Sequence, residues 1–502
     1  MRASDPPATL TALSFRQVAL ALAALTLVRI AGLYASHVDL FMDEAQYWDW
    51  SRELAFGYFS KPPLLAWLIA TTDAVCGNGE ACVRIGSPLL HFVTSFVIYA
   101  IADTLYGRST AAWAALAYGL GTAVVFSARI ISTDVPLLLF WALAMLAYVK
   151  LLHRPDWRWT AVLGIALGLG ILAKYAMVYF LLCAGCAAWF ERDARAVLKQ
   201  PQLWVALGIA ILLVLPNLWW NADNGFATFR HTGDNISGAG LRFRPKGVFD
   251  FVGAQFAVAG PLVFATFLYL LARLVRNRMS REDSLMLAFA IPPLALVVAL
   301  SFFRSAHANW AAPAVTSMTI VAGAWWQRNG WRHWFSITVG LGLVIQVALL
   351  AGDAFADRLS IPLFGKPVDP YHRTLGSKAL GERTAAFAEA NKAKTVAVEG
   401  RSEIAALTYY LRDRPLRTVA WSANQTPDNQ FDLAHPLDNA APEPVLFIST
   451  CPFAARLERF FGKTTPLGAF SVSTGPTSQR QFFAFVLAER RRPIEPLGGC
   501  AP

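Results

Sequence analysis

The chain has 502 residues, of which 56% are hydrophobic and only 15% are charged, and its mean hydropathy is +0.42. This apolar fraction exceeds the roughly 45–50% of soluble globular domains, so the composition excludes an ordinary soluble enzyme and predicts an all-α polytopic membrane protein. The net charge of +11 could suit a nucleic-acid-binding protein, but many Lys and Arg residues lie between apolar runs, where membrane topology places them, and we expect no nucleic-acid partner.

Apolar runs long enough to cross a bilayer recur over the first 352 residues and predict about eleven transmembrane helices. The first run, from about Phe15 to Tyr34, is long enough to span and is followed by further spans, so we expect a retained helix and no cleavable signal peptide. The two runs around Lys174 can form one long kinked helix or two short ones. The predicted spans are 15–35, 84–106, 109–128, 134–151, 159–173, 175–190, 203–220, 248–272, 284–303, 308–326 and 334–352.

The positive-inside rule orients these spans with the N-terminus in the cytoplasm. Basic residues then fall in short cytoplasmic loops, for example Arg154, Arg158, Arg192 and Arg276. An odd number of spans places everything after about residue 352 on the outer side. The same face receives the segments 41–63, 129–134, 221–250 and 304–309, together with Lys174.

The last part of the chain differs in character, because its apolar runs are too short to span and its content of charge and proline is higher. Strand-like runs such as TVAV and VLFIS alternate with helix-like runs such as RSEIAALTYYLRD. We therefore predict a transmembrane domain over 1–352 and a small outer α/β domain over 353–502.

The six cysteines fit this topology. Cys76 and Cys82 share an outer loop, and Cys451 and Cys500 share the tail, so both pairs are candidate disulfides in an oxidising compartment; the alternative is four unpaired thiols. Two more cysteines lie inside an apolar helix, where we expect inert packing; they are Cys183 and Cys186.

The segment 41–63, FMDEAQYWDWSRELAFGYFSKPP, carries acids, bases and many aromatics directly after the first span. Asp43 is a candidate catalytic acid and Glu44 a substrate contact, although either can be a solvated neighbour of lipid headgroups. The aromatic rings suit sugar stacking or interface anchoring, and we select Tyr47 and Tyr58 as substrate-binding candidates. Lys61 precedes two prolines that stiffen the backbone, so its ammonium suits a lipid-linked phosphate or an ordinary headgroup.

Further outward-facing charges lie at the edges of apolar runs. Asp134 is a second candidate catalytic acid, expected to converge with Asp43, although it can simply complement the dipole of its helix. Arg129, Lys174 and Arg304 are candidate substrate-binding cations, because a bare charge at the last two positions would be costly without an anion or an acid.

The sequence assigns no cofactor and no metal site, while leaving a divalent metal open. His231 is a single histidine without a spaced partner, and we interpret it as loop; Arg230 and His307 are weaker outward-facing candidates. Phosphate-cradling glycine loops, paired metal-ligand spacings and nucleophile elbows are absent from the sequence.

Five ordered motifs together resemble the GT-C membrane glycosyltransferases, in the branch that contains the aminoarabinose lipid A transferases and the protein O-mannosyltransferases. The resemblance covers roughly residues 15–350. The motifs are DEAQYW from Asp43, YFSKPPLLAWL from Tyr58, ISTDVP from Ile131, GLGILAKY from Gly168 and HANWAAPA from His307.

This resemblance implies a polyprenyl-phosphate-sugar donor, inversion at the anomeric carbon, a glycolipid acceptor of the lipid A or lipopolysaccharide type, and a site at the outer face of the bacterial inner membrane. It assigns the required acid to Asp43, the second acid to Asp134 and the donor phosphate contact to Lys61. The aminoarabinose enzymes typically carry Arg and Glu where this chain has Gln46 and Ser60. One phosphate-binding arginine and one acid that can hold a metal are therefore missing, which favours another sugar.

Two other classes of function stay open at this point. A transporter or flippase of a lipid-linked sugar would also need charges and aromatics, although the sequence shows no repeated halves. A non-catalytic assembly subunit could use the tail as a binding module. Within the enzyme class, a protein or a cell-wall glycan is an alternative acceptor.

Overall fold

The computed structural model describes residues 13–237, 243–276, 279–363, 365–422 and 427–498. Two compact units can be distinguished, and each is built from separate parts of the chain. The first comprises 1–31, 84–226 and 232–349, and the second comprises 32–83, 227–231 and 350–502.

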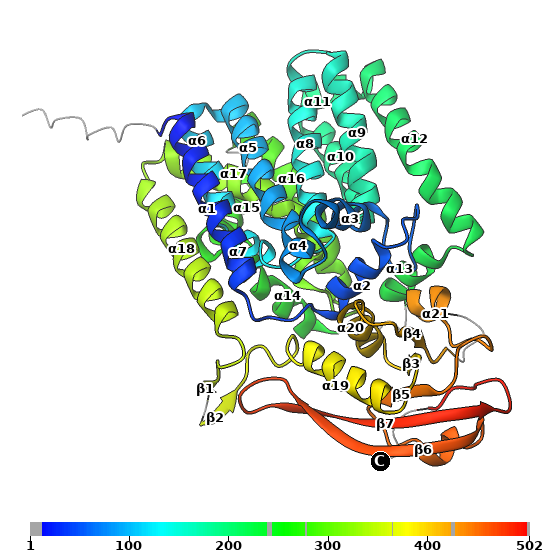
Figure 1. The fold of residues 1–502 in the computed structure, drawn as a ribbon. Helices are drawn as coiled ribbons and strands as arrows, with labels where there is room; N and C mark the ends of the chain where they lie inside the picture. Colours follow the sequence, from blue (N-terminus) through cyan, green and yellow to red (C-terminus); the bar gives the residue numbers. More distant parts are fainter. Residues whose placement is uncertain (1–12, 238–242, 277–278, 364, 423–426, 499–502) are drawn as a thin grey trace, which may run out of the picture. The chain divides into compact units, whose positions relative to one another are not determined.

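The first unit is helical and contains the chain's long apolar helices (Figure 1). Four helices straddle its boundaries with the second unit, namely α1 (Phe15–Ala35), α4 (Glu80–Arg84), α13 (Ala227–Ser237) and α18 (Arg332–Ala354). The others are α5 (Gly86–Tyr106), α6 (Arg108–Gly119), α7 (Thr122–Ser127), α8 (Asp134–His153), α9 (Trp157–Ala173), η1 (Tyr175–Val178), α10 (Tyr179–Phe190), α11 (Arg192–Leu198), α12 (Pro201–Asp223), α14 (Pro245–Val258), α15 (Pro261–Val275), α16 (Arg281–Ser301), η2 (Ala308–Ala311) and α17 (Pro313–Arg328).

Six helices within the described ranges are long and apolar enough to cross a membrane: α1, α4 joined to α5, α8, α12, α16 and α18. These helices establish a multi-pass membrane protein, but the predicted number of eleven is not confirmed. The predicted span 248–272 is wrong as one helix, because Gly260 adopts φ 89° and Pro261 begins a new helix. The predicted span 109–128 is likewise divided between α6 and α7.

The helix pair around Lys174 consists of two separate helices. α9 ends at Ala173, Lys174 is extended with φ −161° and ψ 132°, and a short 3₁₀ turn leads into α10. The break therefore occurs at the charged residue itself.

The interior of the first unit is centred on α8, the most buried of the candidate spans. Trp141 of α8, Phe180 of α10 and Phe289 of α16 meet mainly edge to face, with ring centroids 5.0–6.4 Å apart. This arrangement is favourable for aromatic quadrupoles and fixes the helices against one another. The polar first residue of α8, Asp134, thus projects from a rigid element.

The second unit contains α2 (Met42–Trp50), α3 (Leu64–Cys76) and an α/β tail. Its central sheet has the order β4-β3-β5-β7-β6, with β4, β3 and β5 parallel and the remaining pairs antiparallel. The tail's elements are β1 (Ile361–Leu363), β2 (Lys366–Val368), α19 (Ser377–Ala390), β3 (Thr395–Val398), α20 (Arg401–Tyr410), β4 (Arg417–Ala420), α21 (Gln430–Ala434), β5 (Val445–Ser449), α22 (Ala454–Leu457), β6 (Phe461–Ser473) and β7 (Gln479–Arg490).

Strand β5 lies in the middle of this sheet and is buried along its whole length, as expected for a strand covered on both faces. Helices α19 and α20 lie on one face (Figure 1). On the other face Val445 and Phe447 join an apolar cluster with Trp421, Phe461 and Leu487. The predicted small C-terminal α/β region therefore exists.

The compact units do not follow the predicted boundary at residue 352 alone. The unit that holds the tail also takes in residues 32–83, which carry the segment 41–63. The functional boundaries of 1–352 and 353–502 stay a prediction.

Candidate functional site

Helix α2 carries the acidic motif of the segment 41–63, and Glu44 secures its start. The Glu44 carboxylate accepts the backbone N–H of Phe41 at 3.0 Å, which closes the first turn in the manner of a capping box. Glu44 is buried, so this side chain serves the helix end. Its contact with substrate stays a prediction.

Asp43 is paired with a residue from the tail. Arg401 Nη2 donates to Asp43 Oδ1 at 2.5 Å, and Arg401 Nε donates to Gln46 Oε1 at 2.7 Å. The Arg401 and Asp43 side chains are 37% and 38% exposed, respectively. One face of α2 therefore presents an acid and an arginine side by side, and both are accessible to a ligand.

Both predicted substrate-binding tyrosines are buried near the C-terminal end of α2. The Tyr47 ring packs against Trp50 with centroids 5.2 Å apart, and the Tyr58 ring stacks on Trp50 at 4.6 Å. The Tyr58 hydroxyl donates to the Trp50 carbonyl at 2.8 Å, and burial raises its pKa to about 12. These contacts shape the loop after α2, while sugar binding by either ring stays a prediction.

Lys61 lies at the turn that leads into α3. Its carbonyl accepts the Tyr58 N–H at 3.2 Å, and its side chain is half-buried. Pro63 precedes the first helical residue, Leu64, so the proline pair fixes the entry of α3. The stiff presentation expected for Lys61 fits this backbone, but its phosphate contact is untested.

A histidine from the tail contacts a second acid of α2. His435 Nε2 lies 3.5 Å from Asp49 Oδ1, and this contact raises the pKa of the imidazole above its ordinary value. Helix α2 contains three acids and no base within its bounds. In this unit, the tail therefore supplies the Arg401 guanidinium to Asp43 and the His435 imidazole to Asp49.

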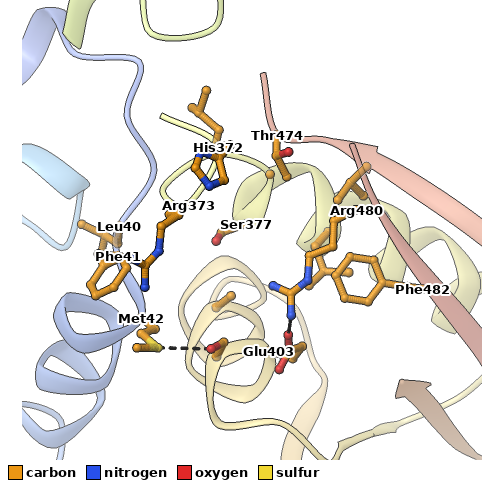
Figure 2. A pocket seen from close by; sticks show the side chains of 16 residues that line it. Leu40, Phe41, Met42, His372, Arg373, Ser377, Glu403, Thr474, Arg480 and Phe482 are labelled. Carbon is orange, nitrogen blue, oxygen red and sulfur yellow. Dashed lines mark hydrogen bonds and ion pairs between the residues drawn. The ribbon is translucent and has the colours of Figure 1, made fainter. Parts of the chain in front are cut away.

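A cavity of about 250 Å³ adjoins the start of α2 within the same unit. Figure 2 shows Arg373 directed toward Phe41 and Met42, while Arg480 forms an ion pair with Glu403. The Met42 sulfur lies 3.1 Å from the Ser402 hydroxyl. The cavity thus borders the residues next to Asp43 and Arg401 on their respective helices.

In the first unit, three of the recognised motifs meet at Asp134. Lys174 Nζ donates to Asp134 Oδ1 at 2.7 Å, and Asn309 Nδ2 donates to Asp134 Oδ2, also at 2.7 Å. The Lys174 and Asp134 side chains are only 18% and 12% exposed. Asp134 is therefore the acid that the isolated charge of Lys174 required.

The two predicted arginines of this unit have their own contacts. The Arg129 guanidinium lies over the Phe126 ring, 5.3 Å from its centroid. Arg304 is half-buried and donates to the Asp234 carbonyl at 3.3 Å. Their binding of substrate is untested.

The two candidate acids differ in how many of their carboxylate oxygens accept a hydrogen bond. Both oxygens of Asp134 accept a hydrogen bond, whereas Asp43 has one oxygen on Arg401 and none of the described residues donates to the other. Asp43 can therefore contact a substrate without displacing a donor. The two acids belong to different units, so their convergence stays a prediction.

Among the described residues, no group of three His, Cys, Asp or Glu side chains is arranged to hold a metal ion. Of the two predicted disulfides, Cys76–Cys82 is confirmed. Cys500 lies outside the described residues. Cys183 and Cys186 are free thiols, the first buried and the second half-buried, and their expected inertness stays a prediction.

The sequence did not single out three residues that contact acidic side chains, namely Arg401, His435 and Asn309. Arg401 follows a strand and begins a helix, a position that often contacts ligands in parallel α/β sheets, and this was the available signal. Asn309 lies within the quoted motif HANWAAPA but carries no charge that would single it out.

Comparisons with known proteins agree with these motifs. The family model described as dolichyl-phosphate-mannose-protein mannosyltransferase matches residues 60–220. A lipid A galacturonosyltransferase of Rhizobium johnstonii is 30% identical over 434 residues, which cover 86% of this chain and 90% of the relative. A lipopolysaccharide core galacturonosyltransferase of the same organism is 28% identical over 42% of this chain and 43% of its own length.

Among solved structures, the fold is similar to that of ArnT from Cupriavidus metallidurans bound to undecaprenyl phosphate. The TM-score is 0.66 at 18% identity, and the match covers 97% of this chain and 100% of that one. The fold, the ordered motifs and the long alignment with a galacturonosyltransferase lead to one assignment. The chain is a glycosyltransferase and belongs to the GT-C superfamily of membrane enzymes, in the branch of the aminoarabinose lipid A transferases and the protein O-mannosyltransferases.

Proposed function

We propose that this enzyme transfers a galacturonosyl residue from a polyprenyl-phosphate carrier to a glycolipid of the lipid A or lipopolysaccharide type. The reaction takes place at the outer face of the bacterial inner membrane, with the N-terminus in the cytoplasm and the tail in the periplasm. The observation that carries the proposal is the 30% identity to a lipid A galacturonosyltransferase over 86% of the chain.

The donor assignment has separate support. A structure with the same overall fold was solved with undecaprenyl phosphate bound. The many apolar helices suit a lipid carrier, because the polyprenyl tail stays in hydrocarbon while the sugar reaches water.

The chemical step is a displacement at the anomeric carbon. An acceptor oxygen forms the new bond on the face opposite the phosphate, the bond from carbon to the phosphate oxygen breaks, and the configuration inverts. Polyprenyl phosphate leaves with the bonding electrons, so negative charge grows on its oxygens. A fixed cation such as Lys61 would stabilise that charge.

Asp43 is the better candidate for direct contact with the reacting groups. If the acceptor is a hydroxyl, its proton passes to the Asp43 oxygen that is not bonded to Arg401. If the acceptor is a phosphate, no proton is lost and the same oxygen orients the sugar. Asp134, held by Lys174 and Asn309, serves to position the ends of α8 and α9.

A test uses the purified enzyme with undecaprenyl-phosphate galacturonic acid and lipid A. The proposal expects galacturonosyl lipid A and free undecaprenyl phosphate in equal amounts. A flippase would instead move the intact donor across vesicles without cleavage. Transfer to a protein or to a cell-wall glycan, with lipid A left unmodified, would replace the acceptor in the proposal.

A further inference from the structure

We infer that Arg401, held by Asp43 and Gln46, forms a subsite for the carboxylate of the donor sugar. The inference rests on the proposed function, because it identifies how that site recognises an acidic sugar. Arg401 then determines the preference for a uronic acid over the neutral hexose of the same configuration.

The first support is the way the guanidinium is held. Of its five N–H groups, one on Nε and one on Nη2 are used to hold Gln46 and Asp43, at 2.7 and 2.5 Å. The remaining N–H groups make no hydrogen bond with the described residues, and 37% of the side chain is exposed. Arg401 is therefore fixed on one edge and available on the other.

The second support is the charge balance of α2. The Asp43 carboxylate would repel an anionic sugar, and the Arg401 guanidinium paired with it offsets that repulsion. Arginine suits this task because its planar fork can donate two parallel hydrogen bonds to one carboxylate. A neutral sugar has no carboxylate and would not form these two charged hydrogen bonds with Arg401.

The third support is the position of Arg401 in the fold. It is the first residue of α20, three residues beyond Val398 at the carboxyl end of the parallel strand β3. Ligand contacts in open parallel sheets come from such positions. The packing of α20 on α2 has other anchors, including Trp48 against Tyr409 with ring centroids 4.9 Å apart, so Arg401 is not needed to join the helices.

The test compares two donors, undecaprenyl-phosphate galacturonic acid and undecaprenyl-phosphate galactose, with the full-length enzyme and its Arg401→Gln variant. The neutral donor is measured as a substrate or, if it is not transferred, as a competitive inhibitor. Either measurement gives the preference of the enzyme for the acidic donor over the neutral one, called here the discrimination ratio. We expect Arg401→Gln to lower kcat/KM for the acidic donor by about 10- to 100-fold, the range of one hydrogen bond to a charged group. The value for the neutral donor should change less than about threefold, well below that range.

Arg417→Gln is the matched control, because Arg417 also pairs with an aspartate of the tail, at 3.0 Å, and is 42% exposed. It should leave both donors unchanged. Gln46→Leu removes one of the groups that hold Arg401 and should raise KM for the acidic donor more than it lowers kcat.

Three outcomes separate the alternatives. An equal loss for both donors, together with weaker binding of undecaprenyl phosphate alone, would assign Arg401 to the phosphate and overturn the inference. A lower thermal midpoint with an unchanged discrimination ratio would make Arg401 only structural and would also overturn it. If the unmodified enzyme transfers no galacturonic acid at all, the proposed function itself fails.

Discussion

Lys174 and Asp134 form an ion pair of 2.7 Å between the break that follows α9 and the first residue of α8. Both side chains are largely buried, so removing one partner leaves the other charge without compensation. We expect Lys174→Met to lower the stability of the detergent-solubilised enzyme by about 3–5 kcal/mol, seen as a lower thermal midpoint.

The double variant Lys174→Met with Asp134→Asn removes both charges and should recover most of that stability. Lys150→Met, at the other end of α8, is the control and should have a small effect. A double variant as unstable as Lys174→Met alone would contradict the pairing.

His435, the residue that follows α21, makes a contact with α2 that depends on pH. The hydrogen bond to Asp49 raises the pKa of His435, so folding favours the protonated imidazole. The stabilisation is complete below the ordinary value of about 6.5 and is lost as the pH rises through the raised pKa. Comparing thermal midpoints, we expect His435→Gln to destabilise the enzyme most below about pH 6.5 and progressively less as the pH rises through the raised pKa.

The control for this measurement is His333→Gln, since His333 is exposed on α18. Its effect on the thermal midpoint should be small. A destabilisation by His435→Gln that is constant from pH 6 to about 9 would show that the charge is not involved.

Asp39 is a buried acid that precedes α2. Burial raises its pKa from 3.8 to about 6, and its carboxylate accepts the Lys378 N–H at 3.1 Å. Because the folded state holds this proton more tightly than the unfolded state, the stability due to Asp39 is present below about pH 4 and is lost toward pH 6. Asp39→Asn should remove this pH dependence and stabilise the enzyme at pH 7.5 by about 1–2 kcal/mol.

Asp413→Asn provides the comparison, because that side chain is 78% exposed. Thermal midpoints between pH 4 and 8 are measured for both variants. If Asp39→Asn follows the same pH profile as the unmodified enzyme, the raised pKa is refuted.

The Cys76–Cys82 disulfide closes a short loop between α3 and α4. The loop-closure entropy of a loop of this length predicts that the Cys76→Ser, Cys82→Ser double variant loses about 2 kcal/mol in its free energy of unfolding. A reducing agent should bring the unmodified enzyme to the same thermal midpoint. Cys186→Ser, which leaves the disulfide intact, should stay sensitive to the reducing agent, and an insensitive unmodified enzyme would contradict the assignment.

The sequence predicted the features that depend on local pattern. The long apolar runs predicted five helices close to their observed bounds, namely α1, α8, α12, α16 and α18. Local pattern also indicated that Lys174 needs an acid, because a charge at the end of an apolar helix is costly without one. It did not show which acid, since Asp134 is forty residues away in the chain.

The contacts of α2 with the tail could not be predicted in this way. Arg401 and Asp43 are 358 positions apart, and hydrophobic periodicity contains no information about such a pairing. The departure at Gln46 suggested a missing cation, yet the structure places the Arg401 guanidinium on the Gln46 side chain. The divided span 248–272 was missed for a different reason, because Gly260 and Pro261 hardly change an average over about 19 residues.

The central claim is that Asp43 acts directly in galacturonosyl transfer, and one measurement tests it most directly. Release of undecaprenyl phosphate from undecaprenyl-phosphate galacturonic acid, in the presence of lipid A, is followed for the unmodified enzyme and for Asp43→Asn. Asparagine keeps the size of the side chain and an oxygen for Arg401, but it cannot accept a proton. We predict a loss of at least about 100-fold in kcat with a folded variant, whereas release that continues at the original rate would contradict the account.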